Sequence, residues 1–265
     1  MDDLRYGRVL ITGAAGAIGR VLRSGLAGRH GCLRLLDVAP LGPAAAAEEV
    51  IQADLLDGPA LDSALAGVDA LVHLAGASDP RDFATMYRTN VHGLYILFEA
   101  ARTHGVRRIV FASSNHAYGM APVDHPVTVT DPPRPDSFYG VTKVFGETLL
   151  RYYWDKHGIE SVSLRIGSFT ERPTEQRHLS TWLSPADGVA LFDRALKQPD
   201  VGAAIVVGMS ANRRLRVGET NWSAIGYRPS DDAESWAGRL REENVDVDGP
   251  PQWGRHGGAY EAADH

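Results

Sequence analysis

Short apolar runs alternate with longer amphipathic runs along most of this chain, and this alternation restricts the fold more than any other feature. The short runs are rich in Val, Ile and Leu, as strands buried on both faces of a sheet are, and the longer runs have helical spacing. A repeated strand-helix order predicts a parallel sheet covered by helices. Strands are expected at 8–12, 33–37, 49–53, 70–74, 108–112, 161–166 and 204–207, and helices at 18–28, 60–65, 83–103, 139–157, 185–197 and 231–243.

The fold class expected from this order is α/β, a doubly wound Rossmann-type parallel sheet with helices on both faces and a small C-terminal substrate-binding portion. The 265 residues suit a single domain of this type (1–265). Loop signals gather in three places, so inserted segments follow particular strands, and the substrate pocket is expected mainly from 166–183 and 209–265. From Asn244 onward the periodicity fades, which indicates either a loosely ordered tail or a segment that folds over the body.

Charge and composition exclude several classes of partner. The formal net charge is -6 without a block of basic residues, which argues against nucleic acid or an anionic membrane as the main partner. No apolar run approaches the roughly 18 residues that span a bilayer, and the acidic start Met1-Asp2-Asp3 does not resemble a secretion signal. Cys32 is the single cysteine, which suits a reducing compartment, so a cytoplasmic protein is expected. The ten histidines show no zinc-binding spacing, and no metal is expected.

The first expected strand leads directly into a glycine-rich turn, Thr12-Gly13-Ala14-Ala15-Gly16-Ala17-Ile18-Gly19. Glycines permit a tight turn, close approach of a pyrophosphate to the backbone, and close packing of the next helix. Backbone N–H groups and the positive end of the helix dipole make such a turn an anion site. The turn therefore predicts dinucleotide binding, although its glycines are spaced three apart twice rather than two and then three. The expected contacts from it are Gly13, Ala15, Gly16, Ala17, Ile18 and Gly19.

An acidic residue ends the second expected strand. Asp37 lies 18 residues after Gly19, where a carboxylate accepts hydrogen bonds from the adenosine ribose and repels a 2′-phosphate. No Lys or Arg follows it immediately, which favours NAD over NADP. Asp54 and Leu55 after the third strand are expected at the adenine, although a turn role suits Asp54 equally. The end of the fourth expected strand, with Leu74, Ala75 and Gly76, is expected to pass under the nicotinamide, where small residues permit close contact.

Tyr139 and Lys143 lie four residues apart in an expected helix and therefore share one helix face. A nearby ammonium favours the phenolate, so we expect Lys143 to lower the pKa of Tyr139 toward neutrality and make it a proton acceptor. Ser114 closes the fifth expected strand, 25 residues before Tyr139. The hydroxyl and the phenol are expected to meet above the carboxyl edge of the sheet.

The glycine turn, Asp37, Ser114, Tyr139 and Lys143 occur in this order, with Asn90 in a long expected helix. In this arrangement the chain resembles the extended branch of the short-chain dehydrogenase/reductase superfamily, and the resemblance spans Arg8 to Gly208. That resemblance implies that Tyr139 is the general base, that Lys143 lowers its pKa and binds the nicotinamide ribose, and that Ser114 orients the substrate hydroxyl. Asn90 would support Lys143 through water, and Ile166 would contact the cofactor. Ser113 is the rival for Ser114. Taken alone, Asn90 also suits a backbone-bonded helix residue, and Lys143 a solvated charge.

A finer resemblance, to the uronate dehydrogenase family, is carried by the runs at 111–116, 164–168 and 177–182 and more loosely at 257–260. It implies NAD-linked oxidation of cyclic galacturonate or glucuronate at C1 to an aldarolactone. Arg177 would clamp the uronate carboxylate, since a planar guanidinium pairs with a carboxylate through two hydrogen bonds. The sugar pocket implied by the resemblance is Ser78, Ser114, Asn115, His116, Tyr139, Ser168, Arg177 and Tyr260.

Several alternatives stay open from the sequence. Arg177 could instead pair with Glu171 or Glu175, and His116 could pack against the sheet edge. Arg213, Arg214 and Arg216 stand where the family pattern predicts aromatic residues. The runner-up activity is a sugar epimerase or dehydratase, and a third is a dinucleotide-binding regulator without turnover. Only 97 residues follow Ser168, which favours a free monosaccharide over a nucleotide sugar. A homo-oligomer through helices 83–103 and 139–157 is expected by analogy.

Overall fold

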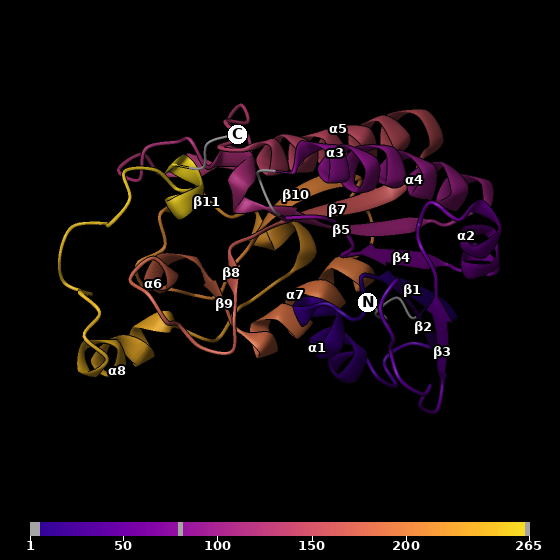
Figure 1. Ribbon diagram of the computed structural model, residues 1–265, viewed down its shortest axis with the longest axis horizontal. Coiled ribbons are helices and arrows are strands. Elements are labelled where there is room, and N and C mark those ends of the chain that lie inside the picture. The colour runs from indigo at the N-terminus through magenta and orange to yellow at the C-terminus, as the bar shows by residue number, and fades with distance from the viewer. Residues whose placement is uncertain (1–5, 79–81, 263–265) are drawn as a thin grey trace.

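The computed structural model describes residues 6–78 and 82–262. At its centre lies a seven-stranded sheet in the order β10-β7-β5-β4-β1-β2-β3, with every neighbouring pair parallel (Figure 1). The strands are β1 (Arg8–Thr12), β2 (Cys32–Asp37), β3 (Glu48–Gln52), β4 (Ala70–His73), β5 (Arg108–Ser114), β7 (Glu160–Ile166) and β10 (Ala203–Gly208). The order reverses between β1 and β4, and doubly wound sheets bind ligands at the carboxyl edge of such a switch point. The expected fold class is confirmed, and all seven strands lie within two residues of their predicted bounds.

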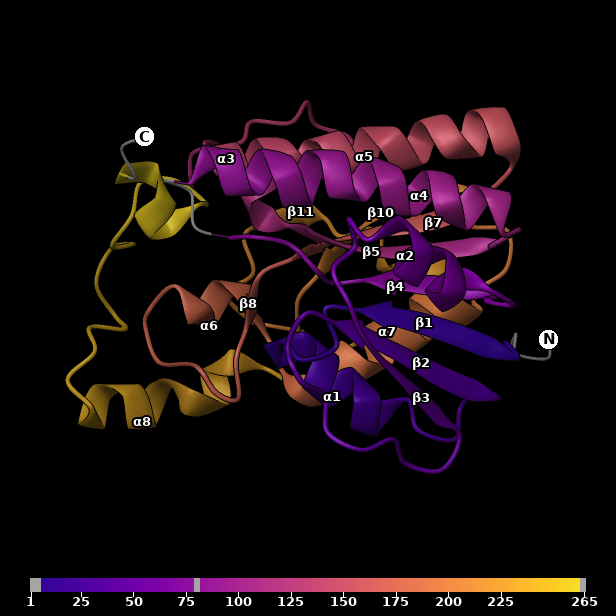
Figure 2. The ribbon, with the colours of Figure 1, turned by 45° about the vertical axis from the view of Figure 1, so that its right-hand side comes forward.

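Helices cover both faces of the sheet (Figure 2). One face carries α2 (Gly58–Leu65), α4 (Leu94–Thr103) and α5 (Phe138–His157), and the other carries α1 (Ala17–Gly25) and α7 (Pro185–Lys197). Side chains alternate between the two faces along each strand. On β1, Leu10 joins the apolar cluster under α4 and α5, whereas Val9 and Ile11 join the cluster under α1 and α7. Both clusters are buried, so the carboxyl edge of the sheet is held on a rigid base.

The long helix expected at 83–103 forms, but it is not regular throughout. It comprises α3 (Phe83–Met86), the π-helical segment η1 (Tyr87–Gly93) and α4. Single π turns inside helices are frequent at functional sites, and this one carries Asn90. The helix expected at 231–243 starts later than predicted, as η4 (Ala233–Trp236) and α8 (Ala237–Glu242), because the Asp232 carboxylate caps the backbone N–H of Glu234 at 2.9 Å.

The C-terminal portion lies beside the carboxyl edge of the sheet (Figure 1). It contains α6 (His178–Thr181), α8, η3 (Trp222–Ile225) and two small parallel ladders. Apart from α8, which belongs to the helix expected at 231–243, sequence periodicity did not predict these elements, because they have two to four residues each. The ladders pair β8 (Ser168–Phe169) with β9 (Trp182–Leu183), and β6 (Val127–Thr128) with β11 (Val217–Glu219).

Residues 249–260, called the strap here, fold back over the body, as the second alternative for the tail predicted. Backbone hydrogen bonds join the strap to residues 119–123: Val123 N–H to Gly254 at 3.1 Å, His256 N–H to Ala121 at 3.1 Å, and Gly257 N–H to Gly119 at 2.9 Å. The strap ends within η5 (Gly258–Ala262). Among the described helices, none is long and apolar enough to cross a bilayer.

Candidate active site

The glycine turn between β1 and α1 brings the backbone of two strand ends together. Gly13 has a φ of 73°, and a Cβ added there would lie 2.5 Å from the nitrogen of Ala75, just after β4. A Cβ on Gly19 would lie 2.6 Å from the Cα of Ala14. Gly16 caps α1 without a side-chain hydrogen bond, and the first turn of α1 carries no acidic residue. The helix start is therefore open to an anion, as the sequence predicts.

A cavity of about 510 Å³ lies along this turn. Nine of the predicted cofactor residues line it, and they are Gly13, Ala15, Gly16, Asp37, Asp54, Leu55, Leu74, Ala75 and Gly76. Ala17 and Gly19 belong to α1 and do not line it, and Ile18 packs against the buried cluster under α1. The remaining four, Asn90, Tyr139, Lys143 and Ile166, lie outside this cavity.

The Asp37 carboxylate lies at the rim of this cavity. It accepts hydrogen bonds from the backbone of Ala15 and of Ala39, each at 2.9 Å, so both of its oxygens are fixed beside the glycine turn. None of the described side chains that line the cavity is basic. A dinucleotide whose adenosine ribose has free hydroxyls fits this site, because the Asp37 carboxylate can accept hydrogen bonds from them. The same carboxylate would repel a 2′-phosphate. Asp54 also has the turn role left open by the sequence, since it accepts from Leu56 N–H at 3.0 Å.

Ser114, Tyr139 and Lys143 meet above the carboxyl end of β5. Ser114 ends this strand, and Tyr139 and Lys143 lie in the first two turns of α5, whose N-cap is Ser137. The Lys143 ammonium donates to the backbone oxygen of Ala112 at 2.8 Å and lies 5.3 Å from the centre of the Tyr139 ring. Lys143 is only 6% exposed. The predicted juxtaposition is therefore present.

The predicted effect of Lys143 on the pKa of Tyr139 is wrong for the protein without a ligand. Burial raises the pKa of Tyr139 to about 12, and a hydrogen bond with Ser114 offsets part of that rise. The ammonium bonds a strand carbonyl and lies over the ring, and its charge is not among the influences that shift the pKa of Tyr139. Burial also lowers the pKa of Lys143 to about 8, and Glu147 partly opposes this change.

Ser113 and Ser114 point to opposite sides of the strand. The Ser113 hydroxyl donates to Glu147 at 2.6 Å, and Glu147 forms a buried two-bond ion pair with Arg165. Ser114 alone of the two faces Tyr139. The structure thus separates the rivals in favour of Ser114 and shows a buried ion pair, Glu147 with Arg165, that the sequence analysis missed.

Asn90 joins the loop after β4 to helix α5. Its amide binds both backbone groups of Ala77, at 2.8 and 2.7 Å, and donates to the Thr142 hydroxyl at 3.1 Å. Its side chain therefore holds the residue next to Lys143, and support of Lys143 through water stays a prediction. Thr142 was missed, because only the folded chain brings it to Asn90.

Arg177 is the centre of a polar group at the ends of β5 and β7. Its guanidinium donates to the Ser168 hydroxyl at 3.2 Å and to the backbone oxygen of His256 in the strap at 3.1 Å. In the orientation that satisfies both ends of its amide, Asn115 accepts from Arg177 at 2.7 Å and donates to the backbone oxygen of Ile166 at 3.2 Å. Arg177 forms no ion pair with any described residue, so the alternative partners Glu171 and Glu175 do not neutralise it.

Two further observations concern the charge of Arg177. Its Nε is buried without a hydrogen-bond partner among the described residues. Burial lowers the pKa of Arg177, and Glu175 opposes this only in part. A bound carboxylate would satisfy both the donor and the charge.

His116 lies between two tyrosine rings. Its ring centre is 5.7 Å from that of Tyr139 and 4.0 Å from that of Tyr260, and its Nδ1 is 2.7 Å from the Asp136 carboxylate. The Tyr260 hydroxyl donates to the backbone oxygen of Ser78 at 2.9 Å, so the strap reaches the loop after β4. His116 is thus a polar residue of the site, not one packed against the sheet edge. Asp136 was missed, although an acid three residues before Tyr139 was a usable signal.

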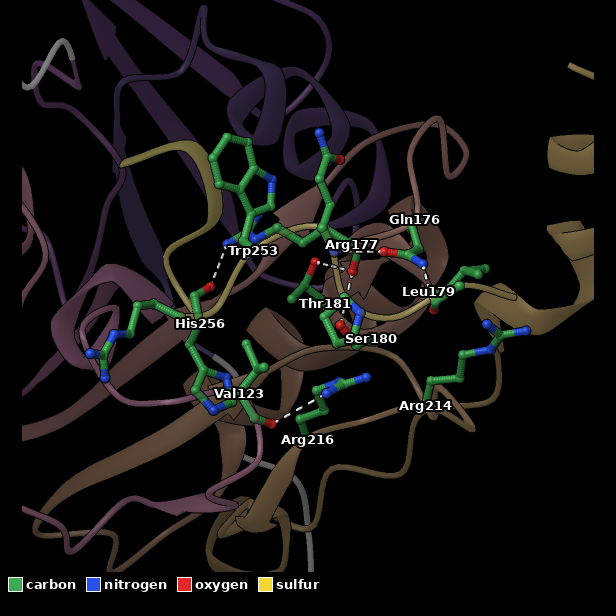
Figure 3. Close-up of a pocket in the computed structure, with 14 residues that line it drawn as sticks. Val123, Gln176, Arg177, Leu179, Ser180, Thr181, Arg214, Arg216, Trp253 and His256 are labelled. Carbon is green, nitrogen blue, oxygen red and sulfur yellow. Dashed lines mark hydrogen bonds between the residues drawn. The ribbon is translucent and has the colours of Figure 1, made fainter. Parts of the chain in front are cut away.

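A small cavity of about 70 Å³ adjoins Arg177 on the strap side (Figure 3). Arg216 faces it and donates to the backbone oxygen of Val123 at 3.3 Å. Arg214 also lines it but is paired with Glu234 at 2.6 Å. Arg216 forms no ion pair within the described part of the chain, so it adds positive charge near Arg177. The arginine-rich segment that departs from the family pattern is therefore part of the pocket surroundings.

Comparison with known proteins agrees with this geometry. The model of the NAD dependent epimerase/dehydratase family matches residues 9–186. The chain belongs to this family. Within the family it groups with the uronate dehydrogenases: the enzyme of that name from Pseudomonas putida is 42% identical, with 99% of this chain and 98% of the relative covered. The resemblance stated from sequence motifs is confirmed.

Solved structures of family members superpose closely. The crystal structure of uronate dehydrogenase from Agrobacterium tumefaciens has a TM-score of 0.91 and 41% identity, with 98% of each chain covered. A tyrosine-to-alanine mutant of that enzyme, complexed with NAD, gives the same score, identity and coverage. The fold and the NAD family are therefore shared along nearly the whole chain.

Proposed function

We propose that this family member oxidises a hexuronic acid, galacturonate or glucuronate, at C1 to the aldarolactone, with NAD as the cofactor. The observation that carries the proposal is the link between Arg177 and the Ser114–Tyr139 pair. Asn115 follows Ser114 directly and contacts Arg177 at 2.7 Å. One end of the pocket can therefore hold an anionic group while the other holds an alcohol beside a phenol. The uronate dehydrogenase name of the relatives supports the same assignment.

Recognition of the carboxylate is assigned to Arg177 with Ser168. A guanidinium with one unpartnered buried nitrogen and no acidic partner binds a carboxylate, and a neutral hexose leaves that donor unsatisfied. Arg216 strengthens the positive field at this end of the pocket. Ser78, Asn115, His116 and Tyr260 would surround the rest of the ring.

Proton removal is assigned to Tyr139. Its phenolate would take the proton of the C1 hydroxyl while Ser114 orients that hydroxyl. Lys143 would hold positive charge over the Tyr139 ring. Because the pKa of Tyr139 is about 12 before ligands bind, the rate should rise with pH across the neutral range. Bound NAD supplies the hydride acceptor and brings a positively charged ring to the site. The sugar ring oxygen stays bonded throughout, so the product is a lactone.

The test is to mix the purified protein with NAD and, separately, galacturonate, glucuronate, glucose and galactose, and to follow NADH absorbance. NADH formation with the uronates and none with the neutral hexoses is expected. Equal rates with both classes would overturn the role of Arg177. Absence of NADH with every sugar would overturn the oxidation itself.

Sugar epimerisation or dehydration is the second candidate, and the family name includes both. Such a reaction returns the hydride within one turnover and releases no NADH. The dTDP-glucose 4,6-dehydratase from Streptomyces niveus matches over only 60% of this chain, compared with 99% for the Pseudomonas putida uronate dehydrogenase. The proposal therefore favours net oxidation.

The expected homo-oligomer stays a prediction, as do a cytoplasmic location and the absence of nucleic-acid binding. Large apolar side chains are exposed on the helices expected to pair between subunits, and they are Phe83, Tyr87, Tyr95, Phe138, Val141 and Tyr152. Sedimentation of the wild type and of Val141→Glu would measure the oligomer, and a weaker association of the variant is expected.

A further inference from the structure

Asp136 is a buried acid that the reaction outlined above does not use. Its side chain is 0% exposed, and its two oxygens have different partners. Oδ1 accepts from the Ser137 hydroxyl at 2.8 Å, and Oδ2 lies 2.7 Å from Nδ1 of His116. A buried carboxylate is costly unless it is paired and hydrogen-bonded, so the proton between Asp136 and His116 belongs on Nδ1.

Two glycines hold this carboxylate against the backbone. A Cβ added at Gly119 would lie 1.8 Å from Oδ2 of Asp136, and one added at Gly257 would lie 1.7 Å from it. Gly119 follows η2 (Asn115–Tyr118), which carries His116, and Gly257 belongs to the strap. Asp136 is thus fixed between the element that carries His116 and the strap that carries Tyr260.

The opposite edge of the His116 ring is available to a ligand. Nε2 of His116 has no hydrogen-bond partner among the described residues, and its side chain is 12% exposed. The ring lies against both Tyr139 and Tyr260. With the proton on Nδ1, Nε2 of a neutral imidazole is an acceptor.

We infer that Asp136 is a positioning residue that fixes His116 so that Nε2 accepts a hydrogen bond from the sugar hydroxyl next to C1. The inference rests on the proposed uronate oxidation, since that function places C1 at Tyr139. Replacement of the acid by an amide of the same shape removes the obligatory acceptor beside Nδ1, so the tautomer with its proton on Nδ1 is no longer enforced. When the amide N–H donates to Nδ1, the proton moves to Nε2. Nε2 then donates where it had accepted.

The test is Asp136→Asn in the wild type and in a His116→Ala background, with Asp155→Asn as the control. Asp155 is exposed on α5, the helix that begins just after Asp136, and makes only a surface pair with Arg151. Asp136→Asn alone should raise the KM for uronate roughly 10- to 100-fold and leave the affinity for NAD unchanged. In the His116→Ala background the second change should have an effect of less than about twofold.

Each result decides a different claim. The positioning role would be overturned if Asp136→Asn raised the KM for uronate as much in the His116→Ala background as in the wild type. It would also be overturned if Asp136→Asn left the KM of the otherwise wild-type enzyme unchanged. A wild type that fails to oxidise uronates would instead overturn the proposed function. Nitrogen NMR of the wild-type protein gives an independent readout even if Asp136→Asn does not fold: a proton on Nδ1 of His116 together with a bare Nε2 supports the inference, and a bare Nδ1 or a proton on both nitrogens overturns it.

Discussion

The two halves of the cleft differ in what they are made of. The cofactor side is largely backbone: glycines, small residues and a helix start line a cavity of about 510 Å³. The sugar side is made of side chains that depend on one another and on the strap, as Arg177 depends on His256 and His116 on Asp136. A backbone site is fixed by the fold itself, whereas a side-chain site depends on each of its supports. Substitutions should therefore separate cofactor affinity from sugar turnover.

The largest expected effect is that of Tyr139→Phe. Loss of a general base lowers kcat by about 100- to 10,000-fold, while the cavity assigned to NAD is untouched. The measurement is kcat with uronate beside the Kd of NAD by titration. Tyr152→Phe is the control, because Tyr152 is 51% exposed on the same helix. Full activity of Tyr139→Phe would contradict the assigned base.

Arg177→Ala should act on the sugar side alone. Truncation of a paired, desolvated charge costs about 2 to 5 kcal/mol, so the KM for uronate should rise by at least about 30-fold with NAD affinity unchanged. Steady-state kinetics measure it. Arg172→Ala is the matched control, since Arg172 pairs with Glu243 at the surface. Unaltered uronate kinetics in Arg177→Ala would remove the carboxylate clamp.

Gly13→Ala should act on the cofactor side alone. The added Cβ would meet the nitrogen of Ala75 at 2.5 Å, whereas a Cβ added at Gly28, which has a similar φ of 72°, would meet no atom within 4 Å. Both variants incur the left-handed strain of about 1 to 2 kcal/mol, so only their difference reports the close approach. Calorimetric titration should show weaker NAD binding for Gly13→Ala than for Gly28→Ala. Equal NAD affinities would show that the turn does not need this contact.

Lys143→Met should remove activity and yet stabilise the fold. The pKa of Lys143 falls from 10.5 unfolded to about 8 folded, so its charge costs stability below pH 8, and the cost fades as the pH rises to 10.5. Removing the charge should gain about 2 kcal/mol at pH 7, after the lost bond to Ala112 is allowed for. Urea unfolding at pH 7 and pH 10.5 measures this, with exposed Lys156→Met as the control. A destabilised variant at pH 7 would contradict the charge cost.

What the sequence predicts well is local. The glycine turn, Asp37 and the Tyr139–Lys143 spacing each lie in one short segment, and the fold brings these segments to one edge of the sheet because parallel strands end there. Thr142 and the backbone of His256 act through partners far along the chain, so no spacing reveals them, whereas the position of Asp136 three residues before Tyr139 was a usable signal. The pKa of Tyr139 was predicted in the wrong direction for a related reason: helix spacing gives the distance to Lys143 but not the extent of burial.

The strap and the residues just before it also determine how the protein would lose activity through proteolysis. Residues 245–254 contain neither helix nor strand and are mostly exposed, which makes them the natural place for a protease to cut. One cut there would leave the sheet and the glycine turn intact. His256 and Tyr260 would no longer be linked to the rest of the chain by a peptide bond. Stored protein nicked in this way would still take up its dinucleotide while losing its sugar turnover, so assays of cofactor content alone would overstate how much enzyme remains intact.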